Sequence, residues 1–226
     1  MDKMKFAKVS FIVLLMLPIK FFGQESELGN WLIYIGNKKI ESKWNWHHEV
    51  QYRNYDAVGD LEQLLLRTGI GYDLKENNNN LLLGYGFIRS ENYNQDSQEK
   101  FIVNEHRIFQ QFITKHKLGV ISLQHRFRFE QRFIEDDQKL RLRYFLGVGV
   151  PLNKKEITDK TLYLSGYTEF FFNTNDDIFD RNRLYGGFGY KFNKKVKVEL
   201  GYMNQFLGNG NNRDQINIIT FSLLVF

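Results

Sequence analysis

Strict alternation of apolar and ionic side chains over long segments constrains this chain more than any other feature. In residues 119–133 the apolar and aromatic side chains alternate with the others and include Ile121, Leu123, Phe127, Phe129 and Phe133. The side chains between them are polar or ionic and include Arg126, Arg128, Glu130 and Arg132. Because successive side chains of a strand point to opposite faces, a period of two predicts a β-strand with one apolar and one ionic face. Residues 140–150, 181–192 and 196–207 repeat the pattern.

Strand-like segments separated by polar turn clusters fill the chain after its first two dozen residues. They lie near 29–36, 42–54, 61–73, 80–90, 101–114, 119–133, 140–150, 161–173, 181–192, 196–207 and 215–226. Most exceed the usual strand of roughly five or six residues and reach the roughly 9–11 that cross a bilayer at a tilt. Helical periodicity and interdomain linkers are missing from the sequence, which indicates a single all-β domain.

Two architectures use such alternation, and they differ in which face is outside. A soluble sandwich or lipocalin-like barrel buries the apolar face, whereas a membrane barrel turns it toward lipid. Aromatic residues cluster near strand ends, with Trp44, Trp46 and Tyr72 at one rim and Tyr52 and Tyr85 at the other, like the interfacial girdles of membrane barrels.

The sequence therefore predicts a transmembrane, antiparallel, up-and-down β-barrel of about 10–12 strands. Single-chain bacterial barrels have an even number of strands. We expect ten strands if residues 29–36 form a partial strand, or twelve if one element escapes the pattern.

Residues 1–23 resemble a secretory signal peptide. Lys3, Lys5 and Lys8 precede an apolar run that Pro18 ends, and Gly23 offers a small residue for cleavage. The alternative is a short membrane anchor, although the run is short for one. Cleavage would leave residues 24–226 as an outer-membrane barrel domain in contact with outer-membrane lipid. Removing four lysines and one aspartate lowers the net charge from +5 to +2, so the basic composition is weak support for nucleic-acid binding and we expect none.

The connections between segments differ at the two ends of the predicted barrel. Lys115–Lys117 and Asn193–Lys195 are predicted as tight periplasmic turns, and the opposite connections, rich in Asn, Asp and Gly, as exterior loops. The last strand ends in Phe226, like the C-terminal signal read by the outer-membrane assembly machinery.

Alternation also predicts which ionic side chains face the lumen. They are Glu49, Arg53, Arg67, Glu105, Arg107, Arg126, Arg128, Glu130, Arg132, Arg141, Arg143, Glu169, Arg181 and Arg183. Glu130 is expected to reach Arg141 or Arg143 across a hairpin. One interpretation is a salt-bridge network that plugs a narrow barrel; the other is a passive channel whose excess arginine selects small anionic solutes, such as acidic oligosaccharides.

An enzyme is the competing class, because outer-membrane hydrolases of lipids or peptides place Ser, His and a carboxylate near a rim. Of the histidines, His47 faces inward beside Glu49, His116 is predicted in a turn, and His48, His106 and His125 face outward. No nucleophile motif accompanies them, so we assign no catalytic residue and expect no cofactor. Without Cys and without metal-ligand spacing in the Asp136-Asp137 or Asp176-Asp177 pairs, we expect no metal site.

Several of these motifs together resemble a known family. They are Glu49-x-x-x-Arg53, Asn104–Gln111, His125–Arg132, Arg141–Tyr144, Glu169–Phe171, Asn182–Tyr185 and Gly201-Tyr202. This set is similar to the domain of unknown function 2490 family over nearly the whole chain after residue 23. The resemblance implies an outer-membrane barrel of a Gram-negative bacterium and implies no established activity.

Overall fold

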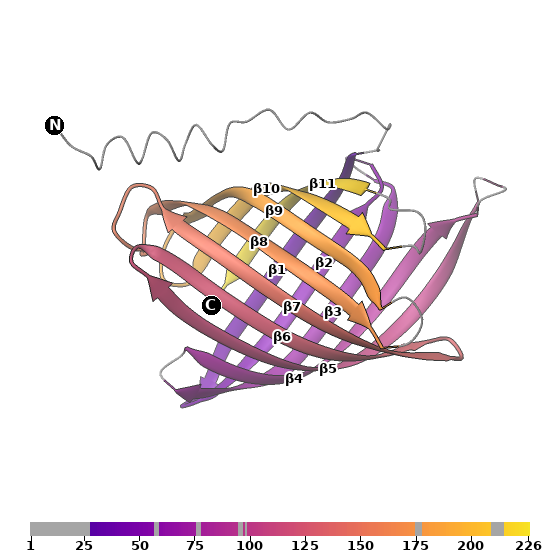
Figure 1. Ribbon diagram of the computed structural model, residues 1–226, viewed down its shortest axis with the longest axis horizontal. Helices are drawn as coiled ribbons and strands as arrows, with labels where there is room; N and C mark the ends of the chain where they lie inside the picture. The colour runs from indigo at the N-terminus through magenta and orange to yellow at the C-terminus, as the bar shows by residue number, and fades with distance from the viewer. Residues whose placement is uncertain are drawn as a thin grey trace.

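Eleven β-strands close into one barrel within the part of the chain that the structure describes (Figure 1). The computed structural model describes residues 28–56, 59–75, 78–94, 97, 99–174, 178–208 and 215–226. The strands are β1 Leu28–Glu41, β2 Trp44–Asn54, β3 Leu61–Lys75, β4 Asn79–Tyr93, β5 Lys100–Leu118, β6 Ile121–Ile134, β7 Asp137–Pro151, β8 Thr161–Asn173, β9 Phe179–Lys191, β10 Val196–Leu207 and β11 Gln215–Val225. The predicted signal peptide, residues 1–23, lies outside these ranges.

The barrel closes through a parallel pair. Each strand is antiparallel to its neighbours in sequence, whereas β1 and β11 run parallel, from Leu28 beside Asn217 to Gly36 beside Val225. The expectation of an even strand number is therefore wrong. Residues 29–36 are no partial strand, because β1 continues through the polar residues Asn37–Lys39, which stay paired with β2. The backbone hydrogen bonds between β1 and β2 therefore extend the strand beyond the last residue of the apolar pattern.

Parallel closure places the start of β1 and the end of β11 at opposite ends of the barrel. We call the "loop end" the one with the β2–β3, β4–β5, β6–β7, β8–β9 and β10–β11 connections, where β1 begins. The "turn end" carries the other connections and the C-terminus, whose Phe226 amide donates to the Lys195 carbonyl at 2.8 Å.

One predicted turn lies inside a strand. Lys115–Lys117 belong to β5, and the β5–β6 hairpin turns at Gly119 and Val120, where Gly119 adopts a φ of +61°. That left-handed conformation suits glycine, which has no Cβ to clash with the backbone. The prediction that His116 lies in a turn is therefore wrong: it extends outward from β5 and stacks on His125, with ring centroids 5.2 Å apart.

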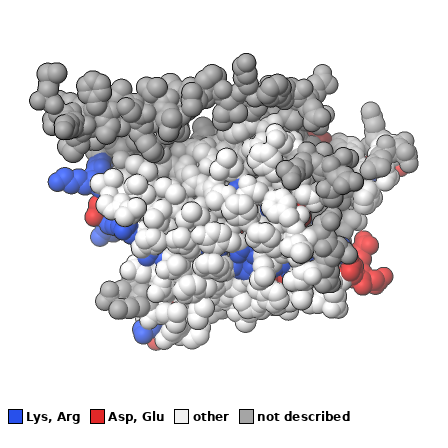
Figure 2. All heavy atoms as spheres, in the orientation of Figure 1, with Lys and Arg blue, Asp and Glu red and all other residues white. Residues whose placement is uncertain are grey.

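The two faces of the wall differ as the alternation predicts. The outward side chains are largely apolar and exposed; among them are Leu32, Leu66, Leu83, Phe127, Leu142, Leu184, Phe188 and Leu200. In Figure 2 this wall is mostly uncharged, and the coloured Lys, Arg, Asp and Glu side chains gather mainly toward its edges. The described ranges contain no helix that is long and apolar enough to cross a membrane.

Glycines on the inner wall make room for large lumenal rings. A Cβ on Gly189 would lie 2.1 Å from the Tyr163 ring, and one on Gly84 would lie 2.3 Å from Phe109. A Cβ on Gly187 would lie 2.4 Å from the Tyr185 hydroxyl. These aromatic side chains therefore lie across the strands, where any larger residue would collide with them.

An arginine-rich lumen as the candidate functional site

The lumenal face holds the ionic residues that the alternation selects. Eleven of them are buried: Glu49, Arg53, Arg67, Glu105, Arg107, Arg128, Glu130, Arg141, Arg143, Glu169 and Arg183. Arg126, Arg132 and Arg181 are half-buried. Because each strand is regular over these positions, one alternation places residues from β2 to β9 on the same inner surface.

Glu130 is the centre of the network and is fully buried. Its Oε2 accepts hydrogen bonds from Nε and Nη2 of Arg141 at 3.0 and 2.7 Å, and its Oε1 accepts from Nη1 of Arg143 at 2.7 Å. Arg128 Nη1 lies 3.6 Å from the same Oε1. Glu130 thus contacts both arginines that the sequence offered as alternatives, and a third on its own strand.

Two further carboxylates hold arginines on the lumenal wall. Glu169 Oε1 lies 2.7 Å from nitrogens of both Arg143 and Arg126, so Arg143 bridges Glu130 and Glu169. Glu105 accepts two hydrogen bonds from Arg107, at 2.6 and 2.7 Å. It also accepts two from Arg132, at 2.5 and 3.0 Å.

Asp180 also joins the network, 3.1 Å from nitrogens of Arg141 and Arg181. The sequence did not point to it, because residue 180 falls in the predicted exterior connection before the strand at 181–192. In the structure β9 begins at Phe179, and the register between β8 and β9 shifts at Phe171 and Phe172.

A separate cluster surrounds Glu49 on β2. Arg67 Nη1 lies 2.5 Å from Glu49 Oε1, and His47 Nε2 lies 3.4 Å from Oε2. The Gln51 amide also donates to Glu49. His47 Nδ1 lies 3.0 Å from Asn37 Oδ1, so the polar partners of its ring among the described residues are Asn37 and Glu49, with no hydroxyl nucleophile. The cluster offers no Ser–His pair for acyl transfer.

Arg53 and Arg183 differ from the other buried arginines. Among the described residues neither has a carboxylate within ion-pair distance. Arg53 donates to Gln51 Oε1 at 2.6 and 3.1 Å and to Gln63 Oε1 at 2.7 Å. Arg183 donates its Nε to Gln205 at 2.7 Å.

Aromatic rings cover these two guanidinium groups. Arg53 lies 3.6 Å and Arg183 4.8 Å from the centroid of the Trp31 ring. Arg183 also lies 4.7 Å from the Phe171 ring, which Arg143 approaches to 4.4 Å. The sequence did not identify Trp31 and Phe171, because only ionic residues were selected there. Phe171 could have been identified from its place on the lumenal face of its strand, two residues after Glu169.

Several apolar side chains on the lumenal face are buried. Phe109, Phe171, Leu65 and Ile88 point inward and are at most 1% exposed, as is Glu130. The lumen is therefore closed to water at these positions of β3, β4, β5, β6 and β8.

A cavity of about 190 Å³ lies in the lumen toward the loop end. Its walls come from the loop-end portions of β2 to β9. They carry eight arginines, namely Arg53, Arg67, Arg107, Arg132, Arg141, Arg143, Arg181 and Arg183. Among the lining residues that the structure describes, Glu105 is the one carboxylate. The arrangement can hold an anion through charge-assisted hydrogen bonds.

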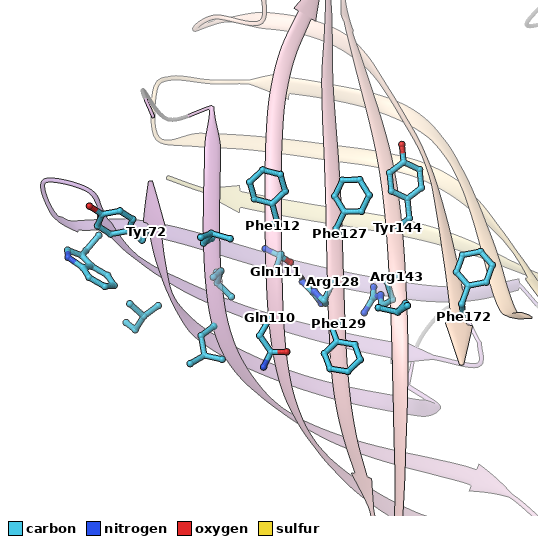
Figure 3. Close-up of a pocket in the computed structure, with 16 residues that line it drawn as sticks. Tyr72, Gln110, Gln111, Phe112, Phe127, Arg128, Phe129, Arg143, Tyr144 and Phe172 are labelled. Atoms are coloured by element: carbon cyan, nitrogen blue, oxygen red, sulfur yellow. Dashed lines mark hydrogen bonds between the residues drawn. The ribbon is translucent and has the colours of Figure 1, made fainter. Parts of the chain in front are cut away.

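A second depression, about 620 Å³ and apolar, lies on the outer wall. Figure 3 shows Phe112, Phe127 and Tyr144 projecting in a row from β5, β6 and β7. Gln110 and Phe129 lie beside that row. Gln110 pairs with Gln131 through two reciprocal amide hydrogen bonds of 3.1 and 3.4 Å, so neither outward amide lacks a partner.

Outward histidines also have polar partners. Tyr34 pairs with His48 at 2.9 Å, Tyr85 with His106 at 2.6 Å, and Tyr144 with His125 at 2.9 Å. Each pairing satisfies a hydroxyl and a ring nitrogen on an apolar surface, which favours a packing role for these histidines. No group of three or more His, Cys, Asp or Glu side chains suited to a metal ion occurs in the described ranges.

A small polar cluster ties the β2–β3 connection to β4 and β5 at the loop end. Lys100 Nζ and the Tyr93 hydroxyl both donate to the Asp60 carboxylate. Partial burial opposes ionisation of Asp60, but these hydrogen bonds outweigh it and hold its pKa below the ordinary value. Burial raises the pKa of the neighbouring Tyr55 to about 12.

The sequence of this chain is similar to those of known proteins. The sequence profile of a family described as "Protein of unknown function (DUF2490)" matches residues 28–217. An uncharacterized protein of Methylorubrum extorquens is 31% identical over 166 residues, which cover 70% of this chain and 69% of the relative. No solved structure matches the chain.

Proposed function

Because the chain belongs to the DUF2490 family of proteins of unknown function, we propose a role from its geometry: an outer-membrane β-barrel whose lumen is closed at its middle. The observation that carries the proposal is the burial of Glu130, Phe109 and Phe171 on the lumenal face, with 1% exposure or less for each. A passive pore needs a continuous watery path through the lumen, and water does not reach these inward side chains.

Placement in a membrane rests on the outer wall. Its exposed side chains form an apolar band that would be unfavourable in water, while the ionic residues face inward. In this setting the loop end faces the cell exterior and the turn end the periplasm, and the apolar depression beside Phe127 is covered by lipid chains. Export by the predicted signal peptide and assembly through the strand ending in Phe226 belong to the same proposal.

An anion-selective channel is the second candidate, and the excess of arginine over carboxylate around the cavity favours it. Conductance of the refolded barrel in a planar bilayer separates the two. We expect the wild-type barrel to insert and carry no steady current. The variant Phe109→Ala/Phe171→Ala removes two buried rings from the lumen without altering a charge. Its barrel should show conductance steps in the bilayer. Steady anion-selective steps from the wild type would overturn the closed lumen and support the channel.

The membrane setting has its own test. Leu142→Arg places a cation on the outer wall, where it should cost about 2–4 kcal/mol near the bilayer midplane and lower the folded fraction in lipid vesicles. Leu118→Arg, at the turn end, should cost only about 0–1 kcal/mol as the matched control. Equal effects from the two substitutions would contradict the proposed placement.

A further inference from the structure

We propose that the cavity at the loop end is a binding site for a small dianion of the phosphate type, held by Arg53 and Arg183. Phosphate would be the ligand of the closed lumen, and the inference rests on the proposed function only for the location of the barrel in the outer membrane. The site itself depends on charges and contacts inside the barrel.

The first argument is a local imbalance of charge. Arg67, Arg107 and Arg141 each reach a carboxylate, whereas Arg53 and Arg183 have only glutamine oxygens as hydrogen-bond acceptors among the described residues. Glutamine supplies a dipole and no charge. Arg53 and Arg183 are 5% and 7% exposed, so water screens them poorly. Two buried cations with no carboxylate within ion-pair distance among the described residues are costly, and a bound dianion would neutralise both.

The second argument is the supply of free donors. A guanidinium group has five N–H donors in a planar fork. The hydrogen bonds of Arg183 to described residues use its Nε alone, which leaves the donors of both terminal nitrogens. Trp31 lies against both guanidinium groups and Phe171 against Arg183, so the rings fix the planes of the two forks. Fixed forks suit bidentate recognition of phosphate or carboxylate oxygens.

The third argument is size. A volume of about 190 Å³ is many times the roughly 10–15 Å³ that a cavity needs to admit one water molecule. That space is enough for a phosphate group or a compact phosphate ester. A phosphate ester carries a charge of about −1.5 to −2 at pH 7, close to the two positive charges of Arg53 and Arg183.

Calorimetric titration of the full barrel, refolded in detergent at pH 7, tests the site. The probes are inorganic phosphate and glycerol phosphate, which distinguish a free ion from an ester, with chloride and acetate as monoanion controls. We expect at least one phosphate probe to bind at least tenfold more tightly than either monoanion and to raise the melting temperature. Binding of both phosphate probes no tighter than that of chloride would overturn the site.

Variants then assign the binding to named residues. Arg53→Met and Arg183→Met should each weaken phosphate binding at least tenfold. Arg126→Met is the matched control, because Arg126 is lumenal, lies outside the cavity lining, and leaves its partner Glu169 paired with Arg143. It should change binding less than twofold. Equal weakening in all three variants would mean general attraction to a basic lumen and would overturn the site.

Thermal stability without ligand separates binding from a structural role. Removing an uncompensated buried charge should leave the melting temperature of Arg53→Met or Arg183→Met unchanged or raised, whereas a purely structural arginine would lower it in both. A lowered melting temperature in both, with phosphate affinity retained, contradicts the inference. A wild-type barrel that conducts and also binds phosphate would contradict the closed lumen and leave the phosphate site supported. A barrel that carries no current and binds no phosphate would contradict the phosphate site and leave the closed lumen supported.

Discussion

Arg143 donates to Glu130 at 2.7 Å while its other terminal nitrogen lies 2.7 Å from Glu169, so one guanidinium group joins carboxylates from β6 and β8. The contact spans three adjacent strands, with β7 between the other two. Because Glu130 has no exposed surface, water does not screen the interaction between Glu130 and Arg143. Removing one partner therefore leaves an uncompensated charge in a dry environment.

We expect Glu130→Gln to destabilise the barrel by about 3–5 kcal/mol, because Arg141, Arg143 and Arg128 would lose the buried carboxylate that they share. Urea unfolding in lipid vesicles measures the change. Glu91→Gln is the control, since Glu91 pairs with the more exposed Arg89 and should cost less than about 1 kcal/mol. Similar small losses in the two variants would show that the network does not hold the barrel together.

Gly189→Ala should destabilise the barrel by about 1–3 kcal/mol, because the new methyl group would overlap the Tyr163 ring. Gly186→Ala adds the same methyl where no atom lies within 4 Å, and should change stability by less than about 1 kcal/mol. The unfolding midpoints of the two variants provide the comparison. If Tyr163→Ala does not reduce the effect of Gly189→Ala, the overlap is not its cause.

Parallel closure predicts an unusual pattern of accessibility. The chain contains no Cys, so single cysteines label cleanly. Leu28→Cys, at the start of β1, should react with a membrane-impermeant maleimide on the same side as Gly59→Cys. Lys195→Cys, beside the C-terminus, should react on the opposite side. An even-stranded barrel instead has both ends on one side, so labelling of Leu28→Cys together with Lys195→Cys would contradict the β1–β11 pairing.

Asp60 gives the loop end a dependence on pH. Its pKa is lower in the folded chain than in the unfolded chain, so its stabilising contribution is complete above the unfolded value of about 3.9. The contribution is lost as the pH falls through the lower, folded value. Asp60→Asn should therefore lower stability at pH 7 by about 0.5 kcal/mol or less and have less effect near pH 2. Urea midpoints at both values test this, and a pH-independent difference would count against it.

Alternation predicted the strands and the direction of their side chains because a strand's period is local. It placed Glu130 and Arg143 in the lumen and His125 on the outer wall, where the structure has them. Strand pairing at closure is not local, so the parity argument for an even barrel did not hold.

The arginine cavity could not be predicted either, because it too depends on contacts between distant strands. Among the described residues, Arg53 and Arg183 have no carboxylate within ion-pair distance, and both contact Trp31. These relationships depend on which side chains meet across the lumen between β1, β2 and β9. No spacing within a single strand contains that information. The register shift that brings Asp180 to Arg141 was hidden for the same reason.

The parallel seam also bears on the order of assembly. Every other strand pair joins neighbours in sequence, so hairpins can form as each segment becomes available, whereas β1 must wait for β11 at the far end of the chain. Contacts between distant segments form slowly because a long loop must first be closed. Until then two unpaired strand edges stay open, one at each end of a curved sheet, and either can pair with another chain. The interval before this last pairing is therefore when a nascent barrel is most prone to join with another copy of itself.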